Sequence, residues 1–197
     1  SGQPQFDAVI KRSRGVADKM SKGVQFLMKK NKIDVVMGFG KLKAKGQLEV
    51  TKADGTKQLV EGKHIIIATG ARSRQLPSMP IDGKKIIGYR EAMVLPQLPK
   101  SIIVVGSGAI GVEFAYFYNS MGSKVTIVEF LPRIVPVEDE DISKELEKSY
   151  KKSGIEILTS AEVTSVDTSG PGVKAKVKTA TGELILEADI LLSAVGI

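Results

Sequence analysis

The second half of the chain alternates short apolar runs with amphipathic segments. Residues 101–105 and 124–128 are apolar runs rich in β-branched side chains, and residues 109–121 between them have helical spacing. Runs of this kind are typical of strands that are buried on both faces of a parallel sheet. Gly122 follows the expected helix, at the position where glycine often closes a helix C-terminus. We therefore predict a strand, helix, strand unit.

Further elements are expected after this unit. Apolar side chains four positions apart predict a helix that starts in the acidic run 138–141 and buries Ile142, Leu146 and Tyr150. Apolar residues alternate with lysines from Val173 onward, which predicts a half-exposed strand. In chain order, the elements are this helix, a strand at 155–158, a hairpin turning at 180–182 and a buried strand at 189–196.

The first half of the chain repeats the later part of this order. Its patterns predict a helix at 16–30, a strand at 33–36, a hairpin turning at 53–55 and a buried strand at 64–70. Corresponding elements of the two halves lie roughly 125 residues apart, so we predict an internal duplication. The apolar face of the first helix consists of Val16, Met20, Val24 and Leu27.

The duplication also predicts a missing part. In the second copy a glycine-rich turn precedes Gly196 by roughly 90 residues. Projected back from Gly70, its counterpart falls before Ser1. We therefore expect this sequence to be a piece of a longer protein that begins inside its first nucleotide-binding domain.

The composition of the 197 residues limits the possible chemistry. There is no cysteine and only one histidine, His64, which excludes disulfides, thiol redox pairs and histidine-rich metal sites from this chain. His64 stands at a strand entrance, where we expect it to be structural or to face solvent. No apolar run approaches the roughly 18 residues of a membrane helix. Residues 1–5 are polar and do not form a secretory signal.

Charge and proline content divide the chain in two. The net charge of +7 is the sum of +11 over residues 1–97 and −4 over residues 98–197. Four of the eight prolines lie between positions 77 and 99, which favours a connector there. We therefore expect a first domain at 1–97, with residues 71–97 as its connector, and a second domain at 98–197.

A G-x-G-x-x-G motif joins the strand at 101–105 to the helix that follows it. Gly106 permits a tight turn, Gly108 lets the backbone approach a pyrophosphate, and Gly111 lets helix and strand pack closely. The free N–H groups and the positive dipole end of the helix favour phosphate binding. The motif therefore predicts a dinucleotide site formed by Gly106, Ser107, Gly108, Ala109, Ile110 and Gly111.

Glu129 ends the next strand, about 18 residues after the motif, where an acid accepts hydrogen bonds from the adenosine ribose. A 2′-phosphate about 4 Å from this carboxylate would be repelled by roughly 4 kcal/mol at an effective dielectric near 20. The next three residues include no base, and Arg133 comes four positions later. The sequence therefore favours NAD(H) over NADP(H).

Two other charged patterns have alternative interpretations. The acidic run 138–141 resembles a set of paired carboxylates, but a solvated helix N-terminus is favoured. Lys174, Lys176 and Lys178 resemble a nucleic-acid-binding stripe, but no aromatic residue interleaves with them, so an exposed strand face is preferred.

The whole motif string resembles the flavoprotein disulfide reductases, and among them most closely the dihydrolipoamide dehydrogenases. The resemblance rests on residues 64–70, the proline-containing connector, residues 104–115 and residues 125–129, and it covers nearly the whole chain. It implies an α/β fold: a three-layer, Rossmann-like FAD/NAD(P)-binding domain with a β-meander crossover, plus a partial copy of the same domain type.

The resemblance also implies roles for individual residues. Glu113 would lie near the nicotinamide carboxamide and the flavin edge, although it is also interpretable as an acid in a helix first turn. Ala109 is often bulkier in these enzymes, which leaves flavin shielding open. No catalytic residue and no metal ligand is expected in this chain. The implied NAD contacts beyond the motif are Val112, Glu113, Glu129, Val163 and Gly196, and the implied FAD contacts are Gly40, Thr69, Gly70 and Ala71.

The parent reaction implied by the resemblance is dihydrolipoamide oxidation, with electrons passing through a cysteine pair and FAD to NAD+. Its partner would be a lipoyl-bearing acyltransferase, its dimer interface would lie in a C-terminal domain outside this chain, and its location would be the cytoplasm or an organelle matrix. Another pyridine nucleotide-disulfide reductase or an NADH:flavin oxidoreductase stays open as an alternative. A nucleic-acid-binding module based on the +11 half is the least favoured reading.

Overall fold

The computed structural model describes residues 5–197, so the polar segment at residues 1–4 lies outside the described residues. The chain divides into two compact units. Residues 5–11 and 71–197 form the first unit, which contains the expected connector, and Arg12–Gly70 form the second. None of the described helices is long and apolar enough to cross a membrane.

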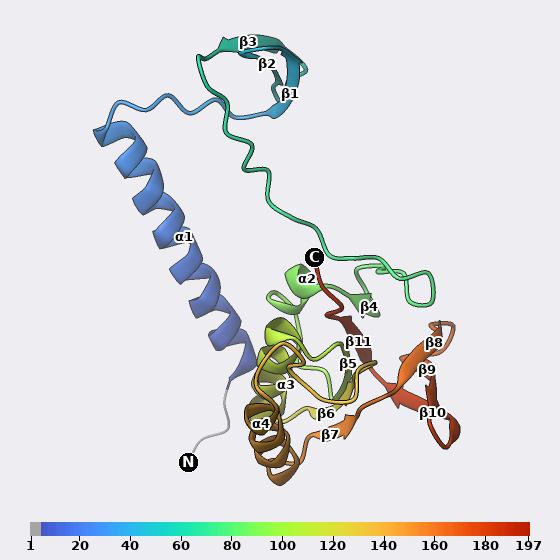
Figure 1. The fold of residues 1–197 in the computed structure, drawn as a ribbon. Coiled ribbons are helices and arrows are strands. Elements are labelled where there is room, and N and C mark those ends of the chain that lie inside the picture. The colour runs from blue at the N-terminus through green and yellow to red at the C-terminus, as the bar shows by residue number, and fades with distance from the viewer. Residues whose placement is uncertain (1–4) are drawn as a thin grey trace. The chain divides into compact units, whose positions relative to one another are not determined.

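A five-stranded parallel sheet forms the centre of the first unit (Figure 1). Its spatial order is β4-β11-β5-β6-β7, so the chain leaves β5 toward β6 on one side and returns as β11 on the other. Ligands of such sheets bind where the strand order reverses, at the carboxyl ends of the strands. The strands are β4 (Ile86–Ile87), β5 (Ser101–Val105), β6 (Lys124–Val128), β7 (Glu156–Leu158) and β11 (Ile190–Ser193).

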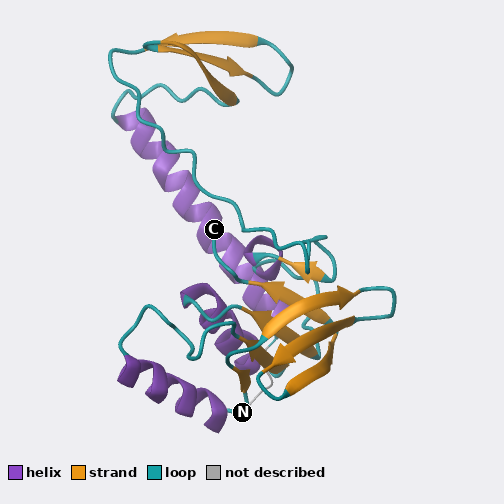
Figure 2. Ribbon diagram, turned by 45° about the vertical axis from the view of Figure 1, so that its right-hand side comes forward, coloured by secondary structure: helices purple, strands orange, loops and turns teal. Residues whose placement is uncertain are grey.

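Alternate side chains of β5 supply two separate cores. Ile102 and Val104 pack toward helices α3 (Ala109–Met121) and α4 (Glu140–Lys152), whereas Ile103 and Val105 pack toward an antiparallel meander. The helices and the meander therefore cover opposite faces of the sheet (Figures 1 and 2). This three-layer arrangement confirms the predicted fold class. The meander consists of β8 (Glu162–Asp167), β9 (Val173–Thr179) and β10 (Gly182–Ala188), in the order β10-β9-β8.

The lysines of β9 lie on the solvent side of the meander. Lys174 pairs with Glu187 at 2.9 Å and Lys176 pairs with Glu183 at 2.8 Å, across the hairpin from β9 to β10. All four side chains are exposed, so these ion pairs contribute little stability. The geometry confirms the interpretation of an exposed strand face.

Helix α1 (Phe6–Lys30) begins ten residues before the predicted helix. Phe6 is buried, with its ring centroid 6.3 Å from those of Phe117 and Tyr118, and Ile10 packs on the same core. The prediction missed this start because charged residues interrupt the apolar spacing before Val16. Burial of one aromatic side chain typically contributes about 1.5–3 kcal/mol, which is enough to hold the first turns of a helix.

The second unit holds the rest of α1 and an antiparallel sheet of three strands in the order β1-β2-β3. The predicted hairpin is present, and the Asp54 carboxylate accepts bonds from the N–H and the hydroxyl of Thr56 at its turn. The first unit also contains a three-stranded antiparallel sheet, so both units share a helix followed by such a sheet. The strands are β1 (Phe39–Ala44), β2 (Gln47–Thr51) and β3 (Lys57–Glu61).

Two predicted strands of this unit are wrong. Residues 33–36 and 64–70 are not assigned to any strand, and most of their side chains are exposed, Ile66 to 90%. A buried parallel strand needs hydrogen-bonding neighbours and cover on both faces. The three strands described between residues 12 and 70 pair only with one another, so these apolar runs have no ladder to join. His64 is exposed, in agreement with the solvent-facing alternative.

The prediction that Ile142 faces the core is also wrong, since this side chain is 59% exposed. The buried face of α4 is instead displaced by one residue to Ser143, and it includes Tyr150 as predicted. The Ser143 hydroxyl donates to the carbonyl of Ile134 at 2.6 Å, and Leu146 packs on the core. A hydrogen-bonded serine thus takes the position that apolar periodicity assigned to isoleucine.

Asp82 organises the turn that leads into β4. Its carboxylate accepts N–H bonds from Lys84, Lys85 and Ile86 at 2.7, 2.8 and 3.1 Å. Burial acts to raise the pKa of Asp82, but the three backbone bonds outweigh it and hold the pKa below its ordinary value. A group with a lowered folded pKa stabilises the fold above its unfolded pKa, and this contribution disappears as pH falls through the folded pKa.

We therefore expect Asp82→Asn to lower the free energy of unfolding at pH 7 by about 0.5–1 kcal/mol, the net value of a typical hydrogen bond. The difference from the wild type should shrink below about pH 4, where the unfolded carboxyl becomes protonated. Urea denaturation of both proteins at pH 7, 5 and 3 measures this difference in the free energy of unfolding. A difference of the same size at all three pH values would contradict this role for Asp82.

Candidate functional site

A cleft of about 910 Å³ opens at the carboxyl ends of β5, β6 and β11. Its position matches the switch point of the sheet, and its volume is within the range of small-molecule sites. Of the residues that the sequence predicted for NAD, the cleft is lined by Gly106, Ser107, Gly108, Ala109, Ile110, Glu129, Val163 and Gly196.

The three motif glycines have different surroundings. Gly106 has a φ of +95°, and a Cβ there would overlap the carbonyl of Ala194. A Cβ at Gly111 would overlap the carbonyl of Gly106. At Gly108, by contrast, a Cβ would meet no protein atom within 4 Å. Gly106 and Gly111 are therefore needed for the packing of the chain, whereas Gly108 keeps open the cleft that it lines.

The N-terminus of α3 presents its backbone amides at this cleft. Gly108 is the N-cap residue in an extended conformation, and no side-chain hydrogen bond caps the helix there. The first regular helical bond recorded at this end runs from the N–H of Val112 to the carbonyl of Gly108. The amides of the first turn have no partner within a helix. Together with the helix dipole, they form a site suited to an anion.

Glu129 is held in the same cleft by three hydrogen bonds. Its Oε2 accepts from the N–H of Ser107 at 2.8 Å and from the Ser107 hydroxyl at 2.6 Å, and its Oε1 accepts from the N–H of Leu131 at 2.8 Å. The backbone N–H of Glu129 donates a hydrogen bond to the carbonyl of Leu158, and its carbonyl accepts one from the N–H of Ala161. Glu129 is only 6% exposed, and hydrogen bonds hold both its main chain and its carboxylate in place.

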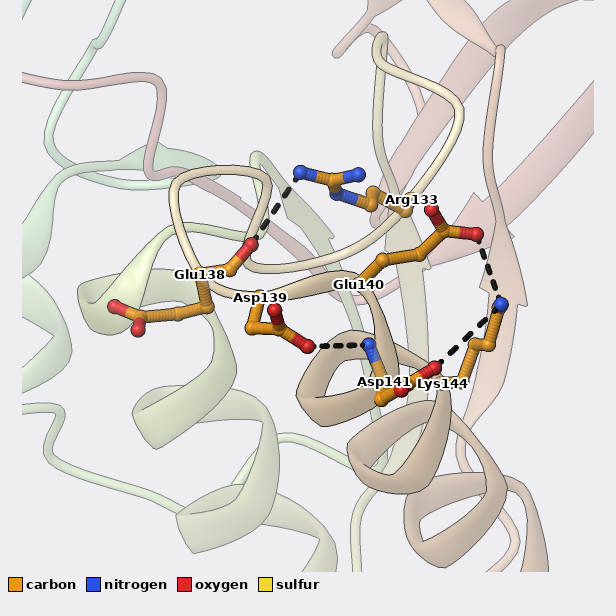
Figure 3. Close-up of polar contacts among 6 residues, drawn as sticks. All are labelled: Arg133, Glu138, Asp139, Glu140, Asp141 and Lys144. Carbon is orange, nitrogen blue, oxygen red and sulfur yellow. Dashed lines mark hydrogen bonds and ion pairs between the residues drawn. The ribbon is translucent and has the colours of Figure 1, made fainter.

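Arg133 does not line the cleft. Its guanidinium donates to the carbonyl oxygens of Pro136 and Glu138, at 3.1 and 3.3 Å, and the second of these bonds is drawn in Figure 3. Arg133 is thus bonded to backbone carbonyls and not to Glu129, in line with the expected preference for a ribose without a 2′-phosphate, and the arginine that lines the cleft is Arg74.

The acidic run 138–141 is a solvated helix start, as predicted (Figure 3). Asp139 caps α4 by accepting the N–H of Asp141 at 2.9 Å. Lys144 lies 2.8 Å from Glu140, and its hydrogen bond and charge lower the pKa of that carboxyl. Among residues 5–197, no group of three or more His, Asp or Glu side chains is placed to hold a metal ion.

Residues 2–197 match the family model described as pyridine nucleotide-disulphide oxidoreductase. The chain belongs to this family. Members of the family bind FAD and NAD. The chain contains no cysteine, so it holds no redox-active cysteine pair of its own.

Similar proteins cover this chain almost completely, but the chain covers less than half of each of them. Dihydrolipoyl dehydrogenase of Rhizobium etli is 46% identical over 100% of this chain and 44% of its own length. Leghemoglobin reductase of Glycine max is 39% identical over 96% of this chain and 36% of its own length. The crystal structure of LpdA from Mycobacterium tuberculosis superposes with a TM-score of 0.89 at 29% identity, covering 99% of this chain and 43% of that one.

Three of the residues implied as NAD contacts do not line this cleft. Gly111 packs against the turn at Gly106. Val112 is on the buried face of α3, and its carbonyl accepts a hydrogen bond from the Tyr150 hydroxyl at 2.9 Å. Glu113 is exposed and does not line the cleft. It is the fifth residue of α3, which places it beyond the first turn and weakens its interaction with the helix dipole.

The residues implied as FAD contacts are exposed in the described structure. Gly40 lies in the exposed strand β1, and Thr69 and Gly70 lie in an exposed segment without regular structure. Ala71 belongs to the first unit and is also exposed.

The sequence prediction missed the wall that the connector contributes. Residues 74 and 76–79 line the cleft, and the N–H of Arg74 donates to the carbonyl of Gly196 at 2.9 Å. Met79 is almost completely buried. A large apolar residue between Pro77 and Pro80 was the available signal, because a free linker has no reason to bury one.

Proposed function

We propose that residues 71–197 bind NAD(H) and that the chain is the NAD-binding part of a dihydrolipoamide dehydrogenase. The observation that carries the proposal is the presence of the free α3 amides and the Glu129 carboxylate in one cleft. The 46% identity to a dihydrolipoyl dehydrogenase supports the substrate class.

Each part of the cleft fits one part of the dinucleotide. The α3 amides bind the pyrophosphate, and Gly108 leaves the room that this approach requires. Glu129 accepts hydrogen bonds from the adenosine ribose, and the buried side chain of Val163 packs beside the adenine. Gly196 lines the nicotinamide end. When NAD+ is bound, it supplies the hydride acceptor of the reaction.

We propose that the whole protein oxidises dihydrolipoamide on a lipoyl-bearing partner, using a cysteine pair and FAD, and that it works as a homodimer. The chain has no cysteine, and its Gly40 and Thr69 are exposed. We therefore expect the 197-residue chain to bind NADH, to retain little or no FAD and to have no dithiol turnover.

A second candidate differs in the substrate. The 39% identity to leghemoglobin reductase supports a pyridine nucleotide reductase with another electron acceptor. Both candidates predict the same NAD site, so the assay of the protein extended to the length of its relatives separates them. Faster reduction of NAD+ by dihydrolipoamide than of other acceptors by NADH favours the dehydrogenase.

The NAD proposal is tested against nucleic-acid binding by two titrations of the same chain. We expect NADH fluorescence to change and to saturate at a 1:1 ratio, and duplex DNA to bind weakly. Raising the salt from low to moderate concentration should remove DNA binding, because scattered lysines act only through phosphate charge. Tight DNA binding with a steep salt slope, together with an unchanged NADH signal, would exclude the NAD proposal.

A further inference from the structure

Ser107 is oriented toward Glu129 and not toward the open cleft. Its side chain is 0% exposed, and its hydroxyl and its backbone N–H both donate to the same oxygen, Oε2 of Glu129, at 2.6 and 2.8 Å. The two donors come from the turn after β5, and the acceptor comes from the end of β6. The serine thus links the phosphate-binding turn to the acid at the end of the neighbouring strand.

The remaining acceptor capacity of Glu129 is small. An ionised carboxylate has about four lone-pair sites, two on each oxygen. The two donors of Ser107 fill those of Oε2, and the N–H of Leu131 fills one on Oε1. One site on Oε1 is left for a ligand. The three protein donors also offset the loss of water around a buried charge.

We propose that Ser107 is a positioning residue that sets the selectivity for NAD(H) over NADP(H), an inference that rests on the proposed function. Its hydroxyl prevents the carboxylate from turning, so that the free site on Oε1 faces the ribose hydroxyl and the negative charge stays where a 2′-phosphate would lie. Ser107 acts through Glu129 and makes no hydrogen bond of its own to the dinucleotide.

The role depends on the hydroxyl in particular. The Ser107 N–H is a backbone group that any residue except proline would supply, and it bonds only one oxygen. Without the hydroxyl, one lone pair of a carboxylate that is 6% exposed loses its donor. The carboxylate then turns toward water in the cleft to regain a partner, because an unsatisfied buried acceptor is unfavourable.

The test measures the dissociation constants of NADH and NADPH for the wild-type chain, Ser107→Ala and Ser107→Gly. We expect the Kd of NADH to rise about 5–10-fold in both variants, the loss that one typical hydrogen bond accounts for. The Kd of NADPH should stay the same or fall, so that the preference for NADH decreases. If circular dichroism shows that the alanine variant does not fold, the test is made with the glycine variant.

Ser193→Ala is the matched control. Ser193 is also a buried serine at the end of a strand of the same sheet, but its hydroxyl has no hydrogen-bond partner among the described residues. The Ser193→Ala variant should have the same Kd for NADH and for NADPH as the wild-type chain. Two results would overturn the Ser107 inference, provided that the wild-type chain binds NADH. The Ser107 variants could keep the wild-type preference for NADH, or they could bind NADH and NADPH more weakly by the same factor, as a purely structural change would cause. Absence of NADH binding by the wild type would instead reject the proposed function itself.

Discussion

NADH affinity is expected to fall at least about 30-fold when Gly108 is replaced by alanine, equivalent to about 2 kcal/mol. A Cβ at this position meets no protein atom within 4 Å, so the fold has room for it. The same space is where the pyrophosphate must approach the amides of α3. The added methyl group therefore hinders binding of the ligand but does not disturb the packing of the chain. Isothermal titration with NADH and urea denaturation of the same variant measure the two effects.

Two other glycine variants separate ligand exclusion from damage to the fold. Gly170→Ala is the matched control, because a Cβ there also meets open space but lies in a surface loop away from the cleft. It should change neither affinity nor stability. Gly111→Ala should instead lower the free energy of unfolding by about 1–3 kcal/mol, because its Cβ overlaps the carbonyl of Gly106. A Gly108→Ala variant that binds NADH as tightly as the wild type would contradict the proposed path of the pyrophosphate.

The second large effect concerns cofactor choice. Glu129→Gln is expected to reduce the preference for NADH over NADPH by about 100-fold or more. The physical reason is charge, because roughly 4 kcal/mol of repulsion separates a carboxylate from a 2′-phosphate about 4 Å away at an effective dielectric near 20. Glutamine keeps the shape of the side chain and one oxygen to accept the bonds from Ser107. Competition titrations with NADH and NADPH give the ratio of dissociation constants.

Glu145→Gln controls for the change in net charge. Glu145 is exposed on α4, where it pairs with Lys148, and an exposed pair of this kind has little effect on stability. The control should keep the wild-type preference. Should Glu129→Gln keep that preference as well, the charge at the end of β6 would not be what selects the cofactor.

Local signals were sufficient to predict the elements around the cleft. The turn after β5 carries its own glycines, and α3 ends at Gly122 with a φ of +107°. Glu129 follows β6 directly. Each of these residues is specified by its immediate neighbours in sequence, so the pattern placed the cleft on the correct strands.

The failed predictions depend on contacts distant in sequence. The apolar runs at 33–36 and 64–70 have the composition of buried strands, but no described strand lies beside them to complete a ladder. Ile142 has the right spacing, yet a hydrogen bond from Ser143 to Ile134 turns α4 by one position. Periodicity reports which residues share a face and cannot report whether a partner for that face exists.

The motif also could not predict the role of Ser107 or the contribution of the connector to the cleft. G-x-G-x-x-G leaves the second position free, so it gave Ser107 no role beyond the loop. Only the arrangement of β5 beside β6 brings its hydroxyl within 2.6 Å of Glu129. The connector wall at Met79 likewise requires the folded sheet.

The central claim is that the cleft at β5, β6 and β11 is an NAD(H) site. The most direct test is to follow the backbone amide signals of the 15N-labelled chain by NMR as NADH is added. The account predicts saturable shifts that concentrate at residues 106–111, at 129–131, at Val163 and at 194–196, with the Arg12–Gly70 unit unaffected. Shifts confined to the Arg12–Gly70 unit, or no shifts at millimolar NADH, would contradict it.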